Sequence, residues 1–269
     1  MIELFEQDKR EQNRKSSKGN QLKWEKNGVW YKADYTGYEG LSEYVVSSLL
    51  EKSSLKEDEF VHYQQEEIRY KSQIYMGVSS KSFLNPGEQL ITLERLFQST
   101  YGDGLNRMVY GIASHEDRLS FLVNKTHEIT GIKGFGEYMA KLLTIDSFFL
   151  NEDRHSHNIA VILDSKGAYR PCPIFDQGAA LLADTTMDYP LDGNTYDLMG
   201  TVSPKTFCER FDEQLEIAEK IYGTCIRFNF TTKDIDTVID TVYGYAPKIT
   251  ERVKNILYEQ IRKYKYFFE

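Results

Sequence analysis

The sequence has few cysteines and no long apolar stretch, and these shortages exclude several classes of protein. Its 269 residues include three cysteines, none of them in a Cys-x-x-Cys pair. This composition excludes a disulfide framework and a cysteine zinc site, and we expect reduced thiols in a cytoplasmic protein. No segment reaches the roughly 18 apolar residues of a membrane span. The N-terminal segment also lacks the apolar core of a signal peptide, so we expect no membrane partner.

Positive charge is also in short supply. Lys and Arg total 33 against 41 Asp and Glu, which gives a formal net charge of −8. Direct nucleic-acid binding is therefore not expected, because it needs a basic face. With 41% hydrophobic and 28% charged residues the chain is an ordinary globular protein, long enough for one large domain or two small lobes.

The first third of the chain has the pattern of antiparallel strands with one helix. Two strand-like segments, 21–25 and 29–34, flank Asn27 and Gly28, a dipeptide that favours the type I′ turn of a hairpin. Residues 40–52 carry apolar side chains at helical spacing. Further short strands are predicted within 60–78, the first of them at 60–63.

The remainder is predicted to be mainly helical, so the expected fold class is α+β. Ser203 is a suitable N-cap and Pro204 a suitable first residue for a helix that ends before Gly223. Residues 151–200 interrupt the helices with a small hairpin and many polar side chains. The other predicted helices follow Ser114, span 136–150, and begin near residues 232 and 247.

Several charged and amide residues occur in the order that phosphoryl transfer from ATP requires. That reaction needs a lysine held by a carboxylate, oxygen ligands for Mg²⁺, and a carboxylate that accepts the proton of the attacking hydroxyl. Lys32 lies in a predicted strand, and Glu43 follows eleven residues later on the predicted helix. Asp153 and Asn158 have the five-residue spacing of the base and the magnesium ligand in protein-kinase catalytic loops. Asp176, at the end of an apolar segment, corresponds in position to the magnesium-binding aspartate of kinases.

Two motifs resemble the signature of HipA-like kinases: Asn151-Glu-Asp-Arg-His-Ser-His-Asn158 and Pro173-Ile-Phe-Asp-Gln-Gly178. These are bacterial Ser/Thr protein kinases whose catalytic lobe also resembles that of phosphatidylinositol kinases. Both groups have Asp-Arg-His where eukaryotic protein kinases have His-Arg-Asp. The resemblance extends by motif from Lys32 to about Leu182. It implies a two-lobed kinase-like fold, with a small antiparallel sheet in an N-lobe (1–83) and a mainly helical C-lobe (84–269).

The resemblance also implies ATP and Mg²⁺ as cofactors and assigns roles to the candidate residues. Lys32 would bind the ATP phosphates and Glu43 would hold Lys32. Asp153 would be the catalytic base, and Asn158 and Asp176 would hold Mg²⁺.

Two further assignments follow from the same resemblance. Arg154 would tie the catalytic loop to an acid such as Asp146. The loop Ser16–Asn20 would cover the phosphates, with Ser17, Lys18, Gly19 and Asn20 at the nucleotide and with Ser16 or Ser17 as a site of autophosphorylation.

The implied function is that of an ATP-dependent Ser/Thr protein kinase. Toxin members of the family often phosphorylate an aminoacyl-tRNA synthetase, which makes such a protein and a cognate antitoxin candidate partners. Only about 20 residues precede the first predicted hairpin, so we expect the short form that lacks the family's extra N-terminal subdomain. A separate protein that supplies this subdomain is then a further candidate partner.

Two alternatives stay open. One is a pseudokinase that binds nucleotide or a partner without chemistry, against which the intact set of Lys32, Asp153, Asn158 and Asp176 argues. The other is a small-molecule or lipid kinase on the same scaffold. The lack of a basic amphipathic helix disfavours lipid as the substrate.

Overall fold

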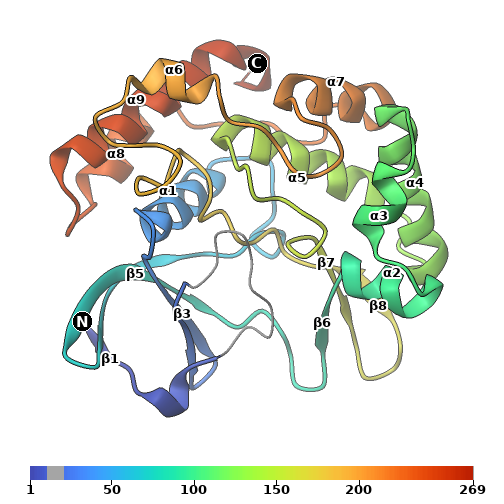
Figure 1. Ribbon diagram of the computed structural model, residues 1–269, viewed down its shortest axis with the longest axis horizontal. Helices are drawn as coiled ribbons and strands as arrows, with labels where there is room; N and C mark the ends of the chain where they lie inside the picture. Colours follow the sequence, from blue (N-terminus) through green and yellow to red (C-terminus); the bar gives the residue numbers. More distant parts are fainter. Residues whose placement is uncertain (11–20, 269) are drawn as a thin grey trace. The chain divides into compact units, whose positions relative to one another are not determined.

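The computed structural model describes residues 1–10 and 21–268, and the chain packs as two compact units (Figure 1). Of the described residues, the first unit contains 1–10, 21–83, 176–202 and 228–268. The second unit contains residues 84–175 and 203–227. The chain passes from the second unit to the first at the peptide bond between Phe175 and Asp176. The predicted boundary between an N-lobe and a C-lobe after residue 83 stays a prediction.

A five-stranded sheet in the order β1-β4-β5-β3-β2 forms the N-terminal part of the first unit. Its neighbouring strands are antiparallel except for β1 and β4. The predicted hairpin turn is confirmed, because Asn27 (φ 54°) and Gly28 (φ 77°) both adopt the left-handed backbone that a type I′ turn needs. The strands are β1 (Ile2–Glu3), β2 (Lys23–Lys26), β3 (Val29–Ala33), β4 (Gln64–Tyr70) and β5 (Gln73–Lys81).

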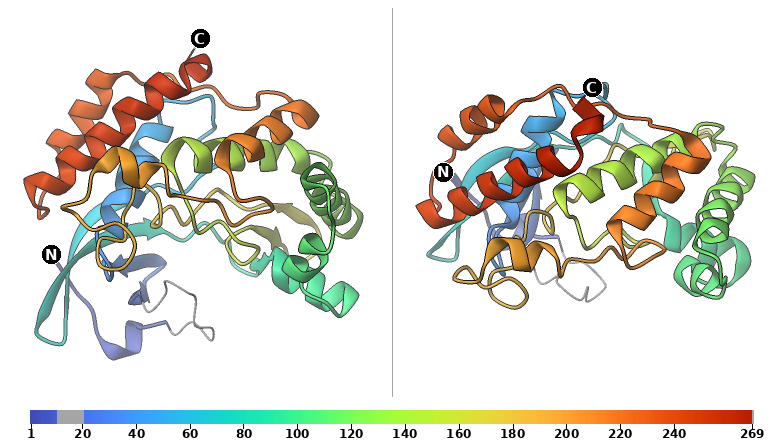
Figure 2. Two further views of the ribbon diagram at one scale, coloured as in Figure 1. Left: turned by 45° about the horizontal axis from the view of Figure 1, so that its top comes forward. Right: turned by 90° about the horizontal axis from the view of Figure 1, so that it is seen from above.

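Helix α1 (Glu39–Leu50) packs directly on this sheet. Two glycines allow the close approach, because a Cβ atom on Gly40 would lie 2.8 Å from the Cα atom of Gly77 on β5. Both views of Figure 2 show α8 and α9 next to α1, in agreement with the contacts of α8 with both helices. The remaining helices of this unit are η1 (Glu6–Asp8), α6 (Thr195–Met199), α8 (Thr232–Asp240), α9 (Pro247–Lys263) and η2 (Lys265–Phe268).

The second unit is built around a buried helix, α5 (Phe135–Phe149), which packs against α4 and α7. Gly136 is needed here, since a Cβ atom at this position would lie 2.3 Å from the ring of Tyr222 on α7. A three-stranded antiparallel sheet in the order β6-β7-β8 completes the unit. Its other elements are β6 (Gln89–Thr92), α2 (Leu93–Tyr101), α3 (Leu105–Tyr110), α4 (His115–Thr130), β7 (Ala160–Leu163), β8 (Tyr169–Pro171) and α7 (Phe211–Tyr222).

The structure confirms the α+β class and corrects two predicted elements. The helix expected from Pro204 begins only at Phe211, although it ends before Gly223 as predicted. Residues 203–210 are not helical because the hydroxyl of Thr206 and the side chain of Phe207 are buried against the rest of the unit. The strand predicted at 60–63 is also absent, since the backbone N–H of Tyr63 donates to the Ser47 side chain on α1 instead of to a neighbouring strand.

Within residues 1–10 and 21–268, none of the helices has both the length and the apolar character needed to cross a bilayer.

Candidate active site

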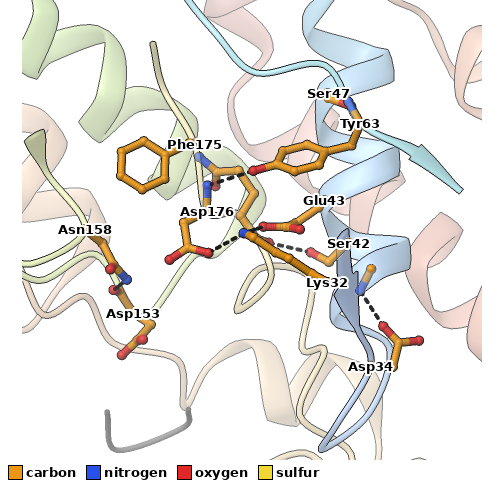
Figure 3. A network of polar contacts seen from close by, with 12 residues as sticks. Lys32, Asp34, Ser42, Glu43, Ser47, Tyr63, Asp153, Asn158, Phe175 and Asp176 are labelled. Carbon is orange, nitrogen blue, oxygen red and sulfur yellow. Dashed lines mark hydrogen bonds and ion pairs between the residues drawn. The ribbon is translucent and has the colours of Figure 1, made fainter. Parts of the chain in front are cut away.

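A cluster of three charged side chains, Lys32, Glu43 and Asp176, lies in the first unit (Figure 3). Lys32 Nζ on β3 lies 2.5 Å from Glu43 Oε1 on α1 and 2.7 Å from Asp176 Oδ1. The structure therefore brings together the lysine and glutamate that the sequence analysis paired. It also places the predicted magnesium-binding aspartate on the same ammonium group, a contact between residues 144 positions apart.

The segment that carries Asp176 is fixed by buried hydrogen bonds. Ser42 Oγ on α1 donates to the backbone carbonyls of Gln177 and Ala180, at 2.8 and 3.0 Å. The backbone N–H of Asp176 donates to the hydroxyl of Tyr63 at 3.4 Å. Asp176 itself has a φ of 64°, a left-handed conformation that non-glycine residues seldom adopt and that the surrounding contacts must hold.

The three charged groups of this cluster shift one another's pKa values. Burial opposes the charge of Lys32, but the carboxylates of Asp176 and Glu43 raise its pKa well above the usual value. Burial also raises the pKa of Glu43, against the effect of Lys32. Among the described residues, no group donates a hydrogen bond to the buried Glu43 Oε2. Two carboxylates thus share the ammonium group of Lys32, and the positive charge of Lys23 also lowers the pKa of Glu43.

The second unit contains the loop 151–158 with the predicted base, Asp153, and the predicted magnesium ligand, Asn158. Asn158 Nδ2 donates to the backbone carbonyl of Asp153 at 3.0 Å, as drawn in Figure 3. This bond brings the two residues together and leaves Oδ1 as the amide atom for another ligand. His155 Nε2 lies 3.7 Å from Asp153 Oδ2.

Arg154 holds this loop in place from inside the unit. Its Nε and Nη2 atoms donate to the two carboxylate oxygens of Asp146 on α5, at 2.9 and 3.0 Å. Its Nη1 atom donates to the carbonyls of Asn158 and Phe175. The predicted structural role of Arg154 with Asp146 is confirmed. The amide of Asn151 adds a hydrogen bond to the same carboxylate.

One residue at the loop was missed by the sequence analysis. Lys205 Nζ lies 3.3 Å from Asp153 Oδ1, although the two residues are 52 positions apart. No motif or spacing marks this lysine, and the helix predicted over this segment gave no reason to connect it with the loop.

The predicted phosphate-covering loop, with Ser16, Ser17, Lys18, Gly19 and Asn20, lies outside the described residues. In the described part of the chain, no three His, Cys, Asp or Glu side chains converge as a metal site. The donors predicted for Mg²⁺ are instead an amide oxygen, on Asn158, and a carboxylate, on Asp176. Hard oxygen donors of this kind, completed by phosphate oxygens, suit Mg²⁺.

Comparison with solved structures shows that the chain has a HipA-like kinase fold. The CtkA proinflammatory kinase of Helicobacter pylori is similar with a TM-score of 0.62 and 18% sequence identity, over 97% of this chain and 94% of that one. A chain of the HipA–HipB–operator DNA toxin–antitoxin complex of Shewanella oneidensis MR-1 is similar with a TM-score of 0.50 and 15% identity, over 94% of this chain and 66% of that one.

No protein-family model and no curated protein matches the sequence. The two structural similarities confirm the fold that the Asp-Arg-His motif implied. At such low identities they concern the fold alone, so an account of function depends on the residues of the site.

Proposed function

We propose that this protein is an ATP- and Mg²⁺-dependent kinase that transfers the γ-phosphoryl group of ATP to a Ser or Thr hydroxyl of a protein. The observation that carries the proposal is the cluster of Lys32, Glu43 and Asp176 in a kinase-like fold. A strand lysine paired with a helix glutamate is the arrangement that protein kinases use to bind phosphate oxygens, with an aspartate close by that holds Mg²⁺. Burying these charges costs free energy of desolvation, which the ion pairs by themselves do not offset in stability.

Each remaining residue has a defined part in the proposed reaction. Asn158 and Asp176 would hold Mg²⁺, which would neutralise charge on the phosphates. Asp153 accepts the proton of the acceptor hydroxyl while the bond from that oxygen to the γ-phosphorus forms. The bond between the γ-phosphorus and the bridging oxygen breaks, and ADP leaves. Arg154 keeps the loop rigid so that Asp153 and Asn158 keep their positions relative to each other.

We extend the proposal to biological role by analogy with the HipA fold. The chain would be a cytoplasmic toxin kinase with a protein substrate, such as an aminoacyl-tRNA synthetase, and with an antitoxin or a protein that supplies the extra subdomain as its partner. In this proposal residues 1–83 form the N-lobe and Ser17–Asn20 contact the nucleotide.

Intact-mass spectrometry of the purified protein with Mg²⁺ and ATP tests the reaction, together with an assay of ADP formation. We expect about 80 Da of added mass per phosphate on the wild type. Asp153→Asn should slow phosphate transfer by about 10²-fold or more, the range for loss of a general base. Asp58→Asn, which changes an exposed carboxylate, is the matched control and should behave as wild type.

Other outcomes of these two assays would contradict parts of the proposal. If the wild type binds ATP but forms neither phosphoprotein nor ADP, self-phosphorylation is excluded. The same assay with candidate protein substrates then decides between a kinase that acts only on a partner and a nucleotide-binding module. If Asp153→Asn reacts as fast as wild type, Asp153 is not the base. Peptide mapping of any phosphorylated product then shows whether Ser16 or Ser17 is modified.

A further inference from the structure

Lys205 occupies a position beside the proposed base that the roles assigned so far do not use. Its ammonium group lies 3.3 Å from Asp153 Oδ1. The Lys205 side chain is 41% exposed and that of Asp153 is 13% exposed, so the pair lies at the surface of its unit. A half-exposed ion pair of this kind adds only about 0–1 kcal/mol to stability.

The backbone around Lys205 is nevertheless held firmly. The adjacent Thr206 is buried, and its hydroxyl donates to the backbone carbonyl of Arg154 at 2.8 Å. The carbonyl of Phe207 accepts from Arg118 Nη1 at 2.9 Å, and the Phe207 ring is fully buried. Lys205 is thus joined to Asp153 by an ion pair, and Thr206 is joined to Arg154 by a buried hydrogen bond.

This arrangement comes with the loss of a helix. The local sequence favours a helix from Pro204, and the chain instead keeps residues 203–210 non-helical, with Lys205 and Thr206 in contact with the loop 151–158. The ion pair itself contributes little to the stability of the fold, although the backbone that carries it is firmly held. A positive charge fixed next to the base does, however, have a use in phosphoryl transfer, because negative charge develops on the oxygens of the transferred group.

We propose that Lys205 contacts the γ-phosphoryl group of ATP during transfer, an inference that rests on the proposed function. The acceptor hydroxyl must hydrogen-bond to Asp153, so a cation that contacts the same carboxylate is within reach of the phosphoryl oxygens. The flexible four-carbon stem of lysine lets Nζ move from Asp153 to the phosphoryl group. The hydroxyl proton passes to Asp153, and Lys205 stays protonated throughout.

The first test measures the rate of ADP formation at a series of ATP concentrations for Lys205→Met, Lys205→Arg and Lys166→Met. Lys166 is an exposed lysine of the same unit, in the turn between β7 and β8, and serves as the matched control. Lys205→Met should lower kcat by about 10²-fold and leave the KM for ATP within a few-fold, because the contact strengthens in the transition state. Lys205→Arg should recover much of the rate, and Lys166→Met should match wild type.

The second test does not depend on turnover. Calorimetry compares binding of Mg²⁺ with ADP and of Mg²⁺ with AMPPNP, a non-hydrolysable analogue that has a γ-phosphoryl group. Lys205→Met should weaken AMPPNP binding by about tenfold relative to ADP binding, equivalent to about 1.4 kcal/mol. Lys166→Met and wild type should not show this selective loss.

The outcomes separate the two proposals. If the wild type binds neither nucleotide, the proposed function fails. If the wild type binds both and Lys205→Met keeps the wild-type ratio of affinities and the wild-type kcat, the inference about Lys205 fails while the kinase proposal stands. A lower melting temperature in Lys205→Met, with no recovery of rate by Lys205→Arg, would also overturn the inference by showing a structural role.

Discussion

The ion pair of Arg154 with Asp146 in one unit and the cluster of Lys32, Glu43 and Asp176 in the other differ in how their charges are satisfied. Arg154 donates two hydrogen bonds to the Asp146 carboxylate, and its Nη1 atom donates to two backbone carbonyls. In the cluster, one ammonium group serves two carboxylates, and one oxygen of Glu43 is buried without a hydrogen bond from any described residue.

This difference separates the expected roles of the two groups of charges. Arg154 and Asp146 form a buried pair with two hydrogen bonds, which joins α5 to the loop 151–158. Lys32 instead contacts two carboxylates, and in the proposed function it binds phosphate oxygens. The same types of side chain therefore stabilise the fold in one unit and are proposed to bind a ligand in the other.

The largest expected effect is the loss of stability when the ion pair of Arg154 with Asp146 is broken. Arg154→Met leaves Asp146 buried without its cation, which should lower the free energy of unfolding by about 3–5 kcal/mol. Urea denaturation measures this loss. Arg107→Met, on an arginine whose side chain is 83% exposed in the same unit, should change stability by less than about 0.5 kcal/mol. Equal effects of the two substitutions would contradict the structural role of Arg154.

A partly buried carboxylate that accepts hydrogen bonds from neutral donors, Asp34, provides the next comparison. Asp34 accepts hydrogen bonds from the Gly40 N–H at 2.6 Å and from the Tyr245 hydroxyl at 2.8 Å. Burial is the main cause that raises the pKa of Asp34 from 3.8 to about 8, and the nearby carboxylate of Glu39 adds to it. The folded state therefore favours the protonated form, and the stability that this provides is complete below pH 3.8 and is lost as pH rises to about 8.

Asp34→Asn should remove this pH dependence. Relative to wild type, the variant should gain up to about 1.4 kcal/mol of stability per pH unit between pH 5 and pH 7, because asparagine does not ionise. Urea denaturation across this range measures the difference, with Asp58→Asn as the exposed control that should show no such trend. A constant difference between Asp34→Asn and wild type at all pH values would show that Asp34 is ionised throughout.

The smallest expected change concerns the cluster of Lys32, Glu43 and Asp176. Glu43→Gln should weaken ATP binding by about tenfold, or about 1.4 kcal/mol, because Lys32 loses one of its two charged partners. Stability at neutral pH should stay the same or rise, since burial raises the pKa of Glu43 and its ionisation opposes folding above its usual pKa. Calorimetric titration and thermal unfolding measure the two effects. A loss of stability as large as that of Arg154→Met would remove the contrast between the two regions.

The sequence predicted best what depends on residues close together in the chain. The Asn27–Gly28 turn follows from backbone preferences, and α5 follows from apolar spacing. The contact between Asp146 and Arg154 spans only eight positions, from the end of a helix into the loop that follows it. Its residues therefore lie near one another once the helix forms.

Predictions failed where a tertiary contact outweighed the local preference. Ser203 and Pro204 are good helix-starting residues, but burial of Thr206 and Phe207 keeps their segment non-helical. Tyr63 belongs to a strand-like sequence, but its backbone N–H bonds to Ser47. In each case one buried polar bond or aromatic ring contributes more than the intrinsic preference of a few residues.

The sequence alone therefore determined the α+β class, the kinase-like motifs and the identity of the residues that carry charge, because these depend on composition and short-range spacing. The tertiary structure alone decided which charges meet. It placed Asp176 on Lys32, Lys205 on Asp153 and Tyr245 on Asp34, each across a long separation in the chain. Such contacts, and the burial that sets their pKa values, depend on the path of the folded backbone, which local patterns do not specify.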